Sequence, residues 1–364
     1  MAKRGQASTR AARIPAVLAA ALAATLLTGC AAIDYYAQAI GGHLDVVSRA
    51  RPIGQWLEAD DAPAALKARL RRALAIREFA SGELSLPDNG SYRRFAELGR
   101  PFVVWNVYAA PEFSVKAAES CFPVAGCVDY RGFYAEAAAQ RHARGLREQG
   151  LDVFVAGVPA YSTLGWFDDP LLSSFIGYAD AELARLIFHE LAHQVAWAKN
   201  DTVFNESFAV AVEEEGVRRW LAQHAAPGES ANFAAAQARK EQFVALVSRH
   251  RERLARHYRE PLSQEEKRAG KARLFGEMAS DYAALKASWG GFTGYDRFFA
   301  QGANNALLAS IVTYTGMVPA FRALLAKHGN DLRAFYDEVK TLSRLDKAGR
   351  AAAMALPAAG RDGG

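Results

Sequence analysis

The sequence predicts an α+β fold with a small β-sheet and a mostly helical second half. Two short runs rich in β-branched and aromatic residues, 102–108 and 153–155, both lie in the first half of the chain. From residue 179 onward the apolar residues recur at helical spacing. Strands that precede a block of helices indicate α+β rather than alternating α/β architecture. The 364 residues, 51% of them hydrophobic and 23% charged, are enough to bury a core without disulfide or metal staples.

The individual elements are predicted in chain order. A helix covers 62–80, a strand 102–108, a second helix 134–149 that Gly150 ends, and a second strand 153–155. Helices then follow at 181–198, 204–224, 231–260, 262–288, 302–312, 317–328 and 331–346, with Asp180 and Thr202 as N-caps of the first two. Residues 61–225 therefore form an α/β part and 226–347 a helical part that packs on it. Residues 348–364 show no pattern and are expected to form a loose tail.

The first 29 residues have the pattern of a secretory signal. Four basic residues come first: Lys3, Arg4, Arg10 and Arg13. The apolar stretch 14–27 that follows is shorter than the roughly 20 residues that a membrane-spanning helix needs. It ends in Leu27-Thr28-Gly29-Cys30, which resembles the lipobox of bacterial lipoproteins, where the cysteine is acylated after cleavage. An ordinary signal with an incidental cysteine, or a buried Ala-rich helix, is the alternative.

The lipobox resemblance predicts a protein of the bacterial cell envelope, lipid-anchored at Cys30 and facing the periplasm. Alanine and not aspartate directly follows Cys30, which by resemblance favours the outer membrane, and residues 30–60 would be the lipidated N-terminus and tether. Cleavage removes four of the 44 basic residues and none of the 39 acidic ones, so the formal charge falls from +5 to about +1. Without a basic excess or an aromatic-basic module, the mature chain is not expected to bind nucleic acid.

Two cysteines remain in the mature chain, Cys121 and Cys127. In an oxidising periplasm this isolated pair, with Pro123 and Gly126 between, predicts a small disulfide loop. Two free buried thiols or two metal ligands are the alternatives, although the spacing is not one of the usual zinc spacings.

The segment His189-Glu190-Leu191-Ala192-His193 is an H-E-x-x-H motif within the predicted helix 181–198. Positions i and i+4 share one helix face, so both imidazoles can bind one Zn²⁺. Glu190 is offset by one residue and is suited to accept a proton from a water molecule that zinc has acidified. The alternative is a surface helix whose histidines have no metal.

A third metal ligand is expected in the next helix. Glu206 lies 13 residues after His193, in the first turn beyond Asn200-Asp201-Thr202, and Asp201 is the fallback ligand. Glu213 follows Glu206 by seven residues on the same helical face, where it would orient a ligand histidine, although it also fits a solvated cluster with Glu214 and Glu215.

These two helices resemble the gluzincin metallopeptidases, in which the zinc helix is followed by a helix with an Asn-Glu-x-x-Ala pattern. Residues 205–209 match it, with Asn205 beside the ligand, whereas the metzincin pattern would need glycine at Ala196 and histidine at Lys199. Further segments match one family: Tyr35-Tyr36-Ala37-Gln38, 121–127 with Tyr130-Arg131-Gly132, Ala160-Tyr161-Ser162-Thr163-Leu164-Gly165, and Asn304-Asn305-Ala306.

Over nearly its full length the chain resembles the predicted zinc-dependent aminopeptidase lipoproteins of double-membraned bacteria. The resemblance implies a zincin-like core, one Zn²⁺ per chain and peptide substrates, and the aminopeptidase label rests on it alone. The Gly-x-Met-Glu-Asn motif, which anchors the substrate amine in the large zinc aminopeptidases, is missing from this sequence. Two other readings remain: a non-catalytic envelope scaffold or chaperone, and an endopeptidase that acts on envelope or cell-wall peptides.

Two tyrosines are candidates for stabilising the oxyanion, Tyr161 and Tyr314, although either fits a structural role. In zincins a strand 25 to 30 residues before the zinc helix forms the edge of the cleft, where a peptide substrate adds as a further strand. Residues 158–164 occupy that place, so Tyr161, Ser162 and Thr163 are expected to line the cleft.

Overall fold

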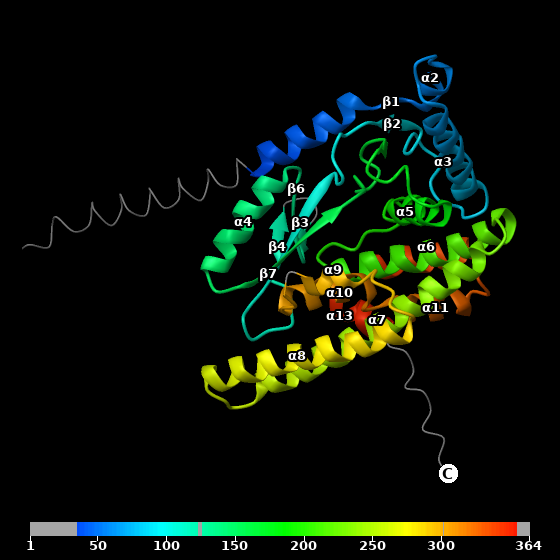
Figure 1. Cartoon of the computed structure of the whole chain (residues 1–364). Helices are drawn as coiled ribbons and strands as arrows, with labels where there is room; N and C mark the ends of the chain where they lie inside the picture. Colours follow the sequence, from blue (N-terminus) through cyan, green and yellow to red (C-terminus); the bar gives the residue numbers. More distant parts are fainter. Residues whose placement is uncertain (1–34, 123–125, 301, 355–364) are drawn as a thin grey trace, which may run out of the picture.

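The computed structural model describes residues 35–122, 126–300 and 302–354 (Figure 1). The predicted signal, Cys30 and residues 355–364 lie outside this range. The first described element is a helix over 35–49, followed by β1 (Arg51–Pro52), α2 (Ile53–Glu58) and α3 (Ala64–Gly82). Val46, Ala50 and Ile53 are buried in the main core. Residues 35–60 therefore form a helix and a connection that pack on the body of the protein.

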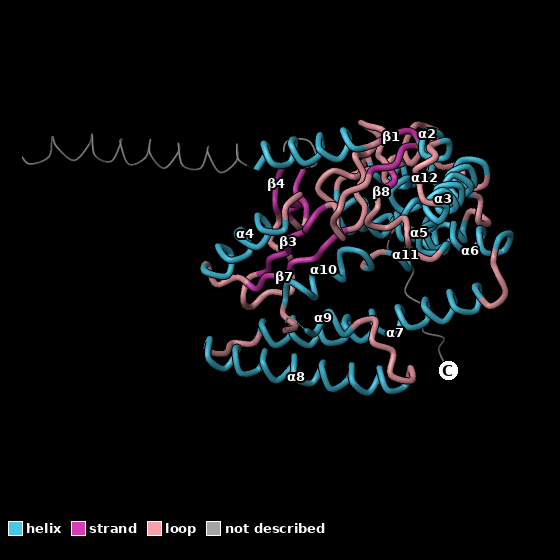
Figure 2. The backbone as a smooth tube through the Cα atoms, turned by 45° about the horizontal axis from the view of Figure 1, so that its top comes forward, coloured by secondary structure: helices cyan, strands magenta, loops and turns pink. Residues whose placement is uncertain are grey.

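The central sheet has the strand order β6-β3-β7, and both pairings are antiparallel. It consists of β3 (Val104–Ala110), β6 (Arg131–Phe133) and β7 (Asp152–Val158). The side chains of β3 alternate between the two faces of the sheet, as the period of two in a strand requires. Trp105 and Val107 pack beneath α4 (Glu136–Glu148), whereas Tyr108 and Ala110 meet α10 (Asn305–Thr315) on the opposite face (Figure 2).

Smaller strands complete the β-structure. β1, β2 (Arg94–Ala96) and β8 (Leu171–Leu172) form one sheet, in which β2 and β8 are parallel, and β4 (Ser120–Phe122) pairs with β5 (Gly126–Val128). Strands of two or three residues are too short to show a period of two, which is why the sequence pattern misses them. Cys121 and Cys127 face each other across the β4–β5 pair and are joined by a disulfide.

The second half is helical, as predicted. It contains α5 (Asp180–Ala192), α6 (Thr202–His224), α7 (Glu229–Arg259), α8 (Gln264–Ser288), α9 (Asp296–Ala300), α11 (Val318–Lys327), α12 (Leu332–Ser343) and α13 (Lys347–Ala353), besides α10. The main core joins these helices to the N-terminal segments, and its largest fully buried side chains include Phe188, Phe208, Trp220, Phe321 and Phe335. α7 and α8 pack on each other around a separate apolar cluster that includes Phe243 and Tyr282. The mixed α+β class is thereby confirmed.

The observed helices differ from the prediction most clearly at the end of α5 and at the N-caps of α5 and α6. α5 ends at Ala192 instead of residue 198, and Asp180 does not cap it, because its carboxylate pairs with Arg69 and Arg72 of α3. α6 is capped by Asp201, not Thr202, since the Asp201 side chain accepts a hydrogen bond from the Phe204 amide.

The segment expected to be a loose tail begins with a helix. α13 covers Lys347–Ala353, and Arg350 is buried there with its Nε 2.8 Å from the Asp201 carboxylate. This ion pair with the cap of α6 explains the order of a segment whose Ala- and Gly-rich sequence shows no amphipathic pattern.

One helical stretch in the described chain is long and apolar enough to cross a membrane by length and composition, Asn305–Lys327. It spans α10 and α11, and its residues Leu307, Leu308 and Phe321 are buried against other elements of the protein. This stretch is therefore a core segment of the fold.

Candidate metal centre

The positions of the three predicted metal ligands follow from how α5 and α6 meet. His193 lies just beyond the last residue of α5 but keeps helical backbone angles, so the i, i+4 relationship with His189 is preserved. The connection to α6 is held by Asn205, whose side chain donates to the Ala198 carbonyl and accepts from the Ala198 amide at 2.9 and 2.7 Å. This clamp turns the first turn of α6 towards α5 and brings Glu206 to the histidines.

The structure brings His189, His193 and Glu206 together. Oε2 of Glu206 lies 3.2 Å from Nε2 of His189 and 3.7 Å from Nε2 of His193. All three side chains are buried, and their ligand atoms lie within 4.8 Å of one another. Two ring nitrogens and one carboxylate oxygen thus converge on a single point between two helices.

Glu213 supports this group from the far side of His189. Its Oε2 lies 2.8 Å from Nδ1 of His189 and 3.2 Å from Arg185 of α5. The Glu213 side chain is 1% exposed, so it does not belong to a solvated acidic cluster. Glu215 does pair with Arg218 and Arg219, as that alternative expects, but its side chain is also largely buried. Glu213 therefore acts as a buried partner that fixes the orientation of the His189 ring.

The electrostatics of the group favour a cation. Burial lowers the pKa of His189, but hydrogen bonds to Glu206 and Glu213 outweigh it and raise this pKa to about 10. Burial raises the pKa of Glu206, yet the charges of His193 and His189 bring it down to about 2. Buried carboxylates in this arrangement require positive charge beside them, from protonated histidines or from a metal ion.

The donor set fits zinc. Two imidazoles and one carboxylate are the ligand set of catalytic zinc sites, which keep a fourth position open. With metal–ligand distances of about 2.0–2.1 Å, tetrahedral ligands lie roughly 3.3 Å apart, which is close to the 3.2 and 3.7 Å found here. The second group of potential ligands among the described residues, Glu119 with Cys121 and Cys127, does not fit, because its sulfurs form the disulfide.

Glu190 is buried beside the group without being part of it. Its pKa is raised by burial, and the nearby His189 and His193 charges offset this in part. A carboxylate with a raised pKa is suited to both accept and return a proton near neutral pH. This is the position that the H-E-x-x-H spacing predicts for a general base.

Comparison with known proteins agrees with this arrangement. The family model described as "Putative aminopeptidase" matches residues 34–354. The chain belongs to this aminopeptidase family. No curated protein and no solved structure matches the chain. Membership in the aminopeptidase family supports a peptidase that acts on peptide substrates, and the match covers both α5 and α6.

Three tyrosines lie near the metal group. The ring of Tyr314 on α10 lies 6.4 Å from that of His189. Burial raises the pKa values of Tyr314 and Tyr130, and the Glu206 charge raises both further. The Tyr108 ring lies 5.4 Å from the Tyr130 ring. The sequence analysis missed Tyr108 and did not assign Tyr130 a role, although Tyr108 ends the predicted strand and Tyr130 lies in a matched segment.

Tyr161 and Asp201 have partners outside the metal group. The Tyr161 hydroxyl forms a hydrogen bond of 2.8 Å with His43, and its ring packs edge-on against Tyr134. Asp201 caps α6 and pairs with Arg350, so it is not a ligand. The strand expected at 158–164 ends at Val158. Pro159 has no amide to donate and Leu164 has a φ of +57°, which a strand does not allow.

The sequence analysis also missed a buried carboxyl near Glu190. Asp169 accepts a hydrogen bond from the Thr163 amide through Oδ2, whereas its buried Oδ1 has no partner among the described residues. Burial raises the pKa of Asp169 to about 7, and the Glu190 charge adds to the effect. No motif surrounds Asp169 in the sequence, so only the fold could identify it.

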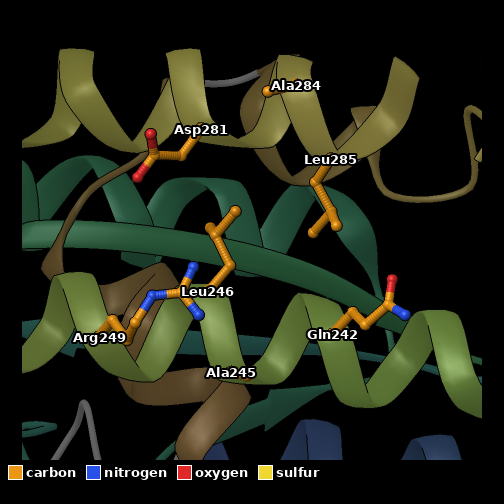
Figure 3. A pocket seen from close by; sticks show the side chains of 7 residues that line it. All are labelled: Gln242, Ala245, Leu246, Arg249, Asp281, Ala284 and Leu285. Atoms are coloured by element: carbon orange, nitrogen blue, oxygen red, sulfur yellow. The ribbon is translucent and has the colours of Figure 1, made fainter. Parts of the chain in front are cut away.

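A shallow pocket of about 440 Å³ lies between α7 and α8 (Figure 3). It is lined by Gln242, Ala245, Leu246, Arg249, Asp281, Ala284 and Leu285. None of these residues contacts the metal group, and the single acid beside one arginine lacks the ligand set of a metal site. The chemistry of this aminopeptidase-family chain is therefore assigned to α5 and α6.

Proposed function

We propose that this protein is a zinc-dependent metallopeptidase that hydrolyses peptide bonds, with the aminopeptidase activity that its family description indicates. The observation that carries the proposal is the buried convergence of His189, His193 and Glu206, with Glu213 behind His189. A buried site with this donor set is suited to zinc. The family to which the chain belongs supports peptides as substrates.

His189, His193 and Glu206 would hold the metal. Zinc, when bound, supplies Lewis acidity, which lowers the pKa of a water molecule towards neutrality and polarises a carbonyl group. Glu190 then takes the proton of the attacking water and delivers it to the leaving amine, a dual role that its raised pKa supports. Glu213 and Asn205 are positioning residues, since one orients the His189 ring and the other holds the α5–α6 turn.

The proposed location is the periplasmic face of the outer membrane, with lipid attached at Cys30. This part of the proposal rests on the signal pattern and the lipobox resemblance. Acylation with two or more chains would give stable anchoring. Mass spectrometry of the N-terminal peptide from membrane-purified protein tests it, since an unmodified Cys30 would contradict the anchor without touching the proposed chemistry.

The central test combines metal analysis with one isosteric substitution. Purified protein is expected to contain about one zinc per chain, and a chelator should abolish peptide hydrolysis until zinc is restored. Glu190→Gln should keep the metal and lose hydrolysis, because the amide cannot accept a proton. Glu206→Gln should lose the metal itself.

Three outcomes would contradict the proposal in different ways. Hydrolysis by Glu190→Gln at the wild-type rate would remove Glu190 from the mechanism. Full activity in metal-free protein would show that zinc takes no part in the reaction. A wild-type protein that holds zinc but cleaves nothing across a diverse peptide library would favour a non-catalytic scaffold.

A further inference from the structure

The N-terminal helix over 35–49 carries its apolar side chains on the outside. Tyr36, Ile40 and Leu44 are 39%, 60% and 59% exposed, and their spacing of four residues places them along one face. The other exposed positions from 36 to 49 are Ala37, Gly41, Ser48 and Arg49, and the charged side chains beside this row, Asp45 and Arg49, form an ion pair with each other. A surface helix of a soluble protein normally shows the reverse pattern, with charged and polar residues facing water.

A second exposed apolar element lies against this helix. Trp166 and Phe167 are 75% and 57% exposed, and the Phe167 ring is 4.9 Å from the ring of His43. The turn that presents them is held by two hydrogen bonds between the Thr163 hydroxyl and the Phe167 backbone, both of 3.2 Å. Leu164 and Gly165 both have positive φ in this turn.

We name the five residues Tyr36, Ile40, Leu44, Trp166 and Phe167 the outer apolar patch. They account for five of the eight large hydrophobic side chains that are exposed in the described chain. Single exposed apolar residues are normal, but a group of them marks an interaction surface. In Figures 1 and 2 the N-terminal helix runs along the rim of the molecule, with no other element over its outer side.

We propose that the outer apolar patch docks on the surface of a phospholipid bilayer. The described part of the helix starts at Tyr35, five residues after Cys30, and five residues of any conformation span at most roughly 17 Å. Lipid at Cys30 would therefore hold the patch within reach of the headgroups. Aromatic and aliphatic side chains along one row of a helix suit insertion at the headgroup level. This inference rests on the proposed lipid anchor, which supplies the reason for choosing a bilayer over a protein partner.

Docking in this way would orient the metal centre relative to the membrane. The loop that presents Trp166 continues to Asp169, whose amide donates to the Ser91 hydroxyl at 3.2 Å. Gln194, which directly follows His193, donates to the same hydroxyl at 3.2 Å. Ser91 thus joins the membrane-facing loop to the end of the metal-binding segment, and the centre would be held at a set distance from the bilayer.

The test uses the full mature chain with Cys30→Ser, which cannot be acylated. It is mixed with vesicles of phosphatidylethanolamine and phosphatidylglycerol, and the vesicle-bound fraction is measured by flotation at low and high salt. We expect the unacylated chain to bind, with little change at high salt, because the patch carries no charge. Introducing Ile40→Glu and Leu44→Glu together should weaken vesicle binding by about tenfold or more, since both apolar side chains would lose their insertion.

Leu345→Glu is the matched control, because Leu345 is another exposed hydrophobic residue, 41% exposed and outside the patch. It should leave vesicle binding unchanged, and thermal melting of all variants should match the parent chain, since none of the three side chains is in the core. Trp166→Ala, which introduces no charge, should weaken binding as well.

The proposal is overturned if the Cys30→Ser chain does not float, or if the double variant floats as well as its parent. If the chain does not bind vesicles but light scattering shows dimers, the outer apolar patch would instead be an interface between two copies of this chain. Acylation of Cys30 is measured separately by mass spectrometry, so failure of the anchor and failure of the patch are distinguishable.

Discussion

Glu213 and Glu206 bind opposite nitrogens of the same imidazole. Oε2 of Glu213 lies 2.8 Å from Nδ1 of His189, and Oε2 of Glu206 lies 3.2 Å from its Nε2. Both carboxylates come from α6, seven residues apart on one face of the helix. The ring is therefore fixed with Nδ1 as the donor to Glu213, and a metal ion would take the place of the Nε2 proton that faces Glu206.

Replacing Glu213 by glutamine should weaken zinc binding without removing any ligand. The neutral amide can still contact His189 but no longer raises the basicity of the ring, so we expect the zinc affinity to fall by about 10- to 100-fold. Competition with a chromogenic chelator measures the change. Glu215→Gln is the control, because Glu215 lies on the same helix and pairs with Arg218 and Arg219. Equal zinc affinities in the two variants would show that Glu213 does not support zinc binding.

Tyr314→Phe should lower the turnover number while zinc content and KM stay near their wild-type values. Burial and the Glu206 charge raise the pKa of Tyr314, so its hydroxyl stays protonated and able to donate to a developing oxyanion. Loss of one such donor costs about 100-fold or more in kcat. Tyr161→Phe is the comparison, since the Tyr161 hydroxyl is engaged with His43. A larger loss in Tyr161→Phe would reverse the assignment.

Asp169 should make the free energy of unfolding depend on pH. Burial raises its pKa in the folded state to about 7, whereas the unfolded value is 3.8. The folded state thus binds the proton more tightly, so the stabilising contribution is complete below about pH 4 and is lost as pH rises towards and through 7. Urea unfolding of the wild type at pH 5 and pH 8 should reveal this loss, and Asp169→Asn should reduce it. The same pH dependence in both proteins would contradict the prediction.

Peptides with a free amino terminus should be cleaved at least about tenfold faster than their N-acetylated forms. This expectation rests on the family description, since Glu206 is assigned to the metal and Glu190 to proton transfer. Paired peptide libraries analysed by mass spectrometry give both rates in one experiment. Equal cleavage rates for the two peptide forms would exclude aminopeptidase activity. The same site would then be assigned to an endopeptidase.

Local patterns determined much of this protein. The i, i+4 spacing of His189 and His193 depends only on helix geometry, so one short segment of sequence predicted their shared face. Glu206 was also within reach of sequence reasoning, because a short turn between two helices limits where the next side chains can lie. The α+β class and the order of the helices followed from the apolar period.

Only the tertiary structure decided which distant groups surround the centre. Tyr108, Tyr130 and Tyr314 come from a strand, a loop and a helix that are far apart in sequence, and packing of α10 on β3 brings them together. The burial of Asp169 and the pairing of Arg350 with Asp201 likewise depend on contacts across the fold. Burial sets these pKa values, and a long-range ion pair stabilises the cap of α6. Burial and long-range pairing leave no periodic pattern or fixed spacing in a sequence, so they could not be predicted from it.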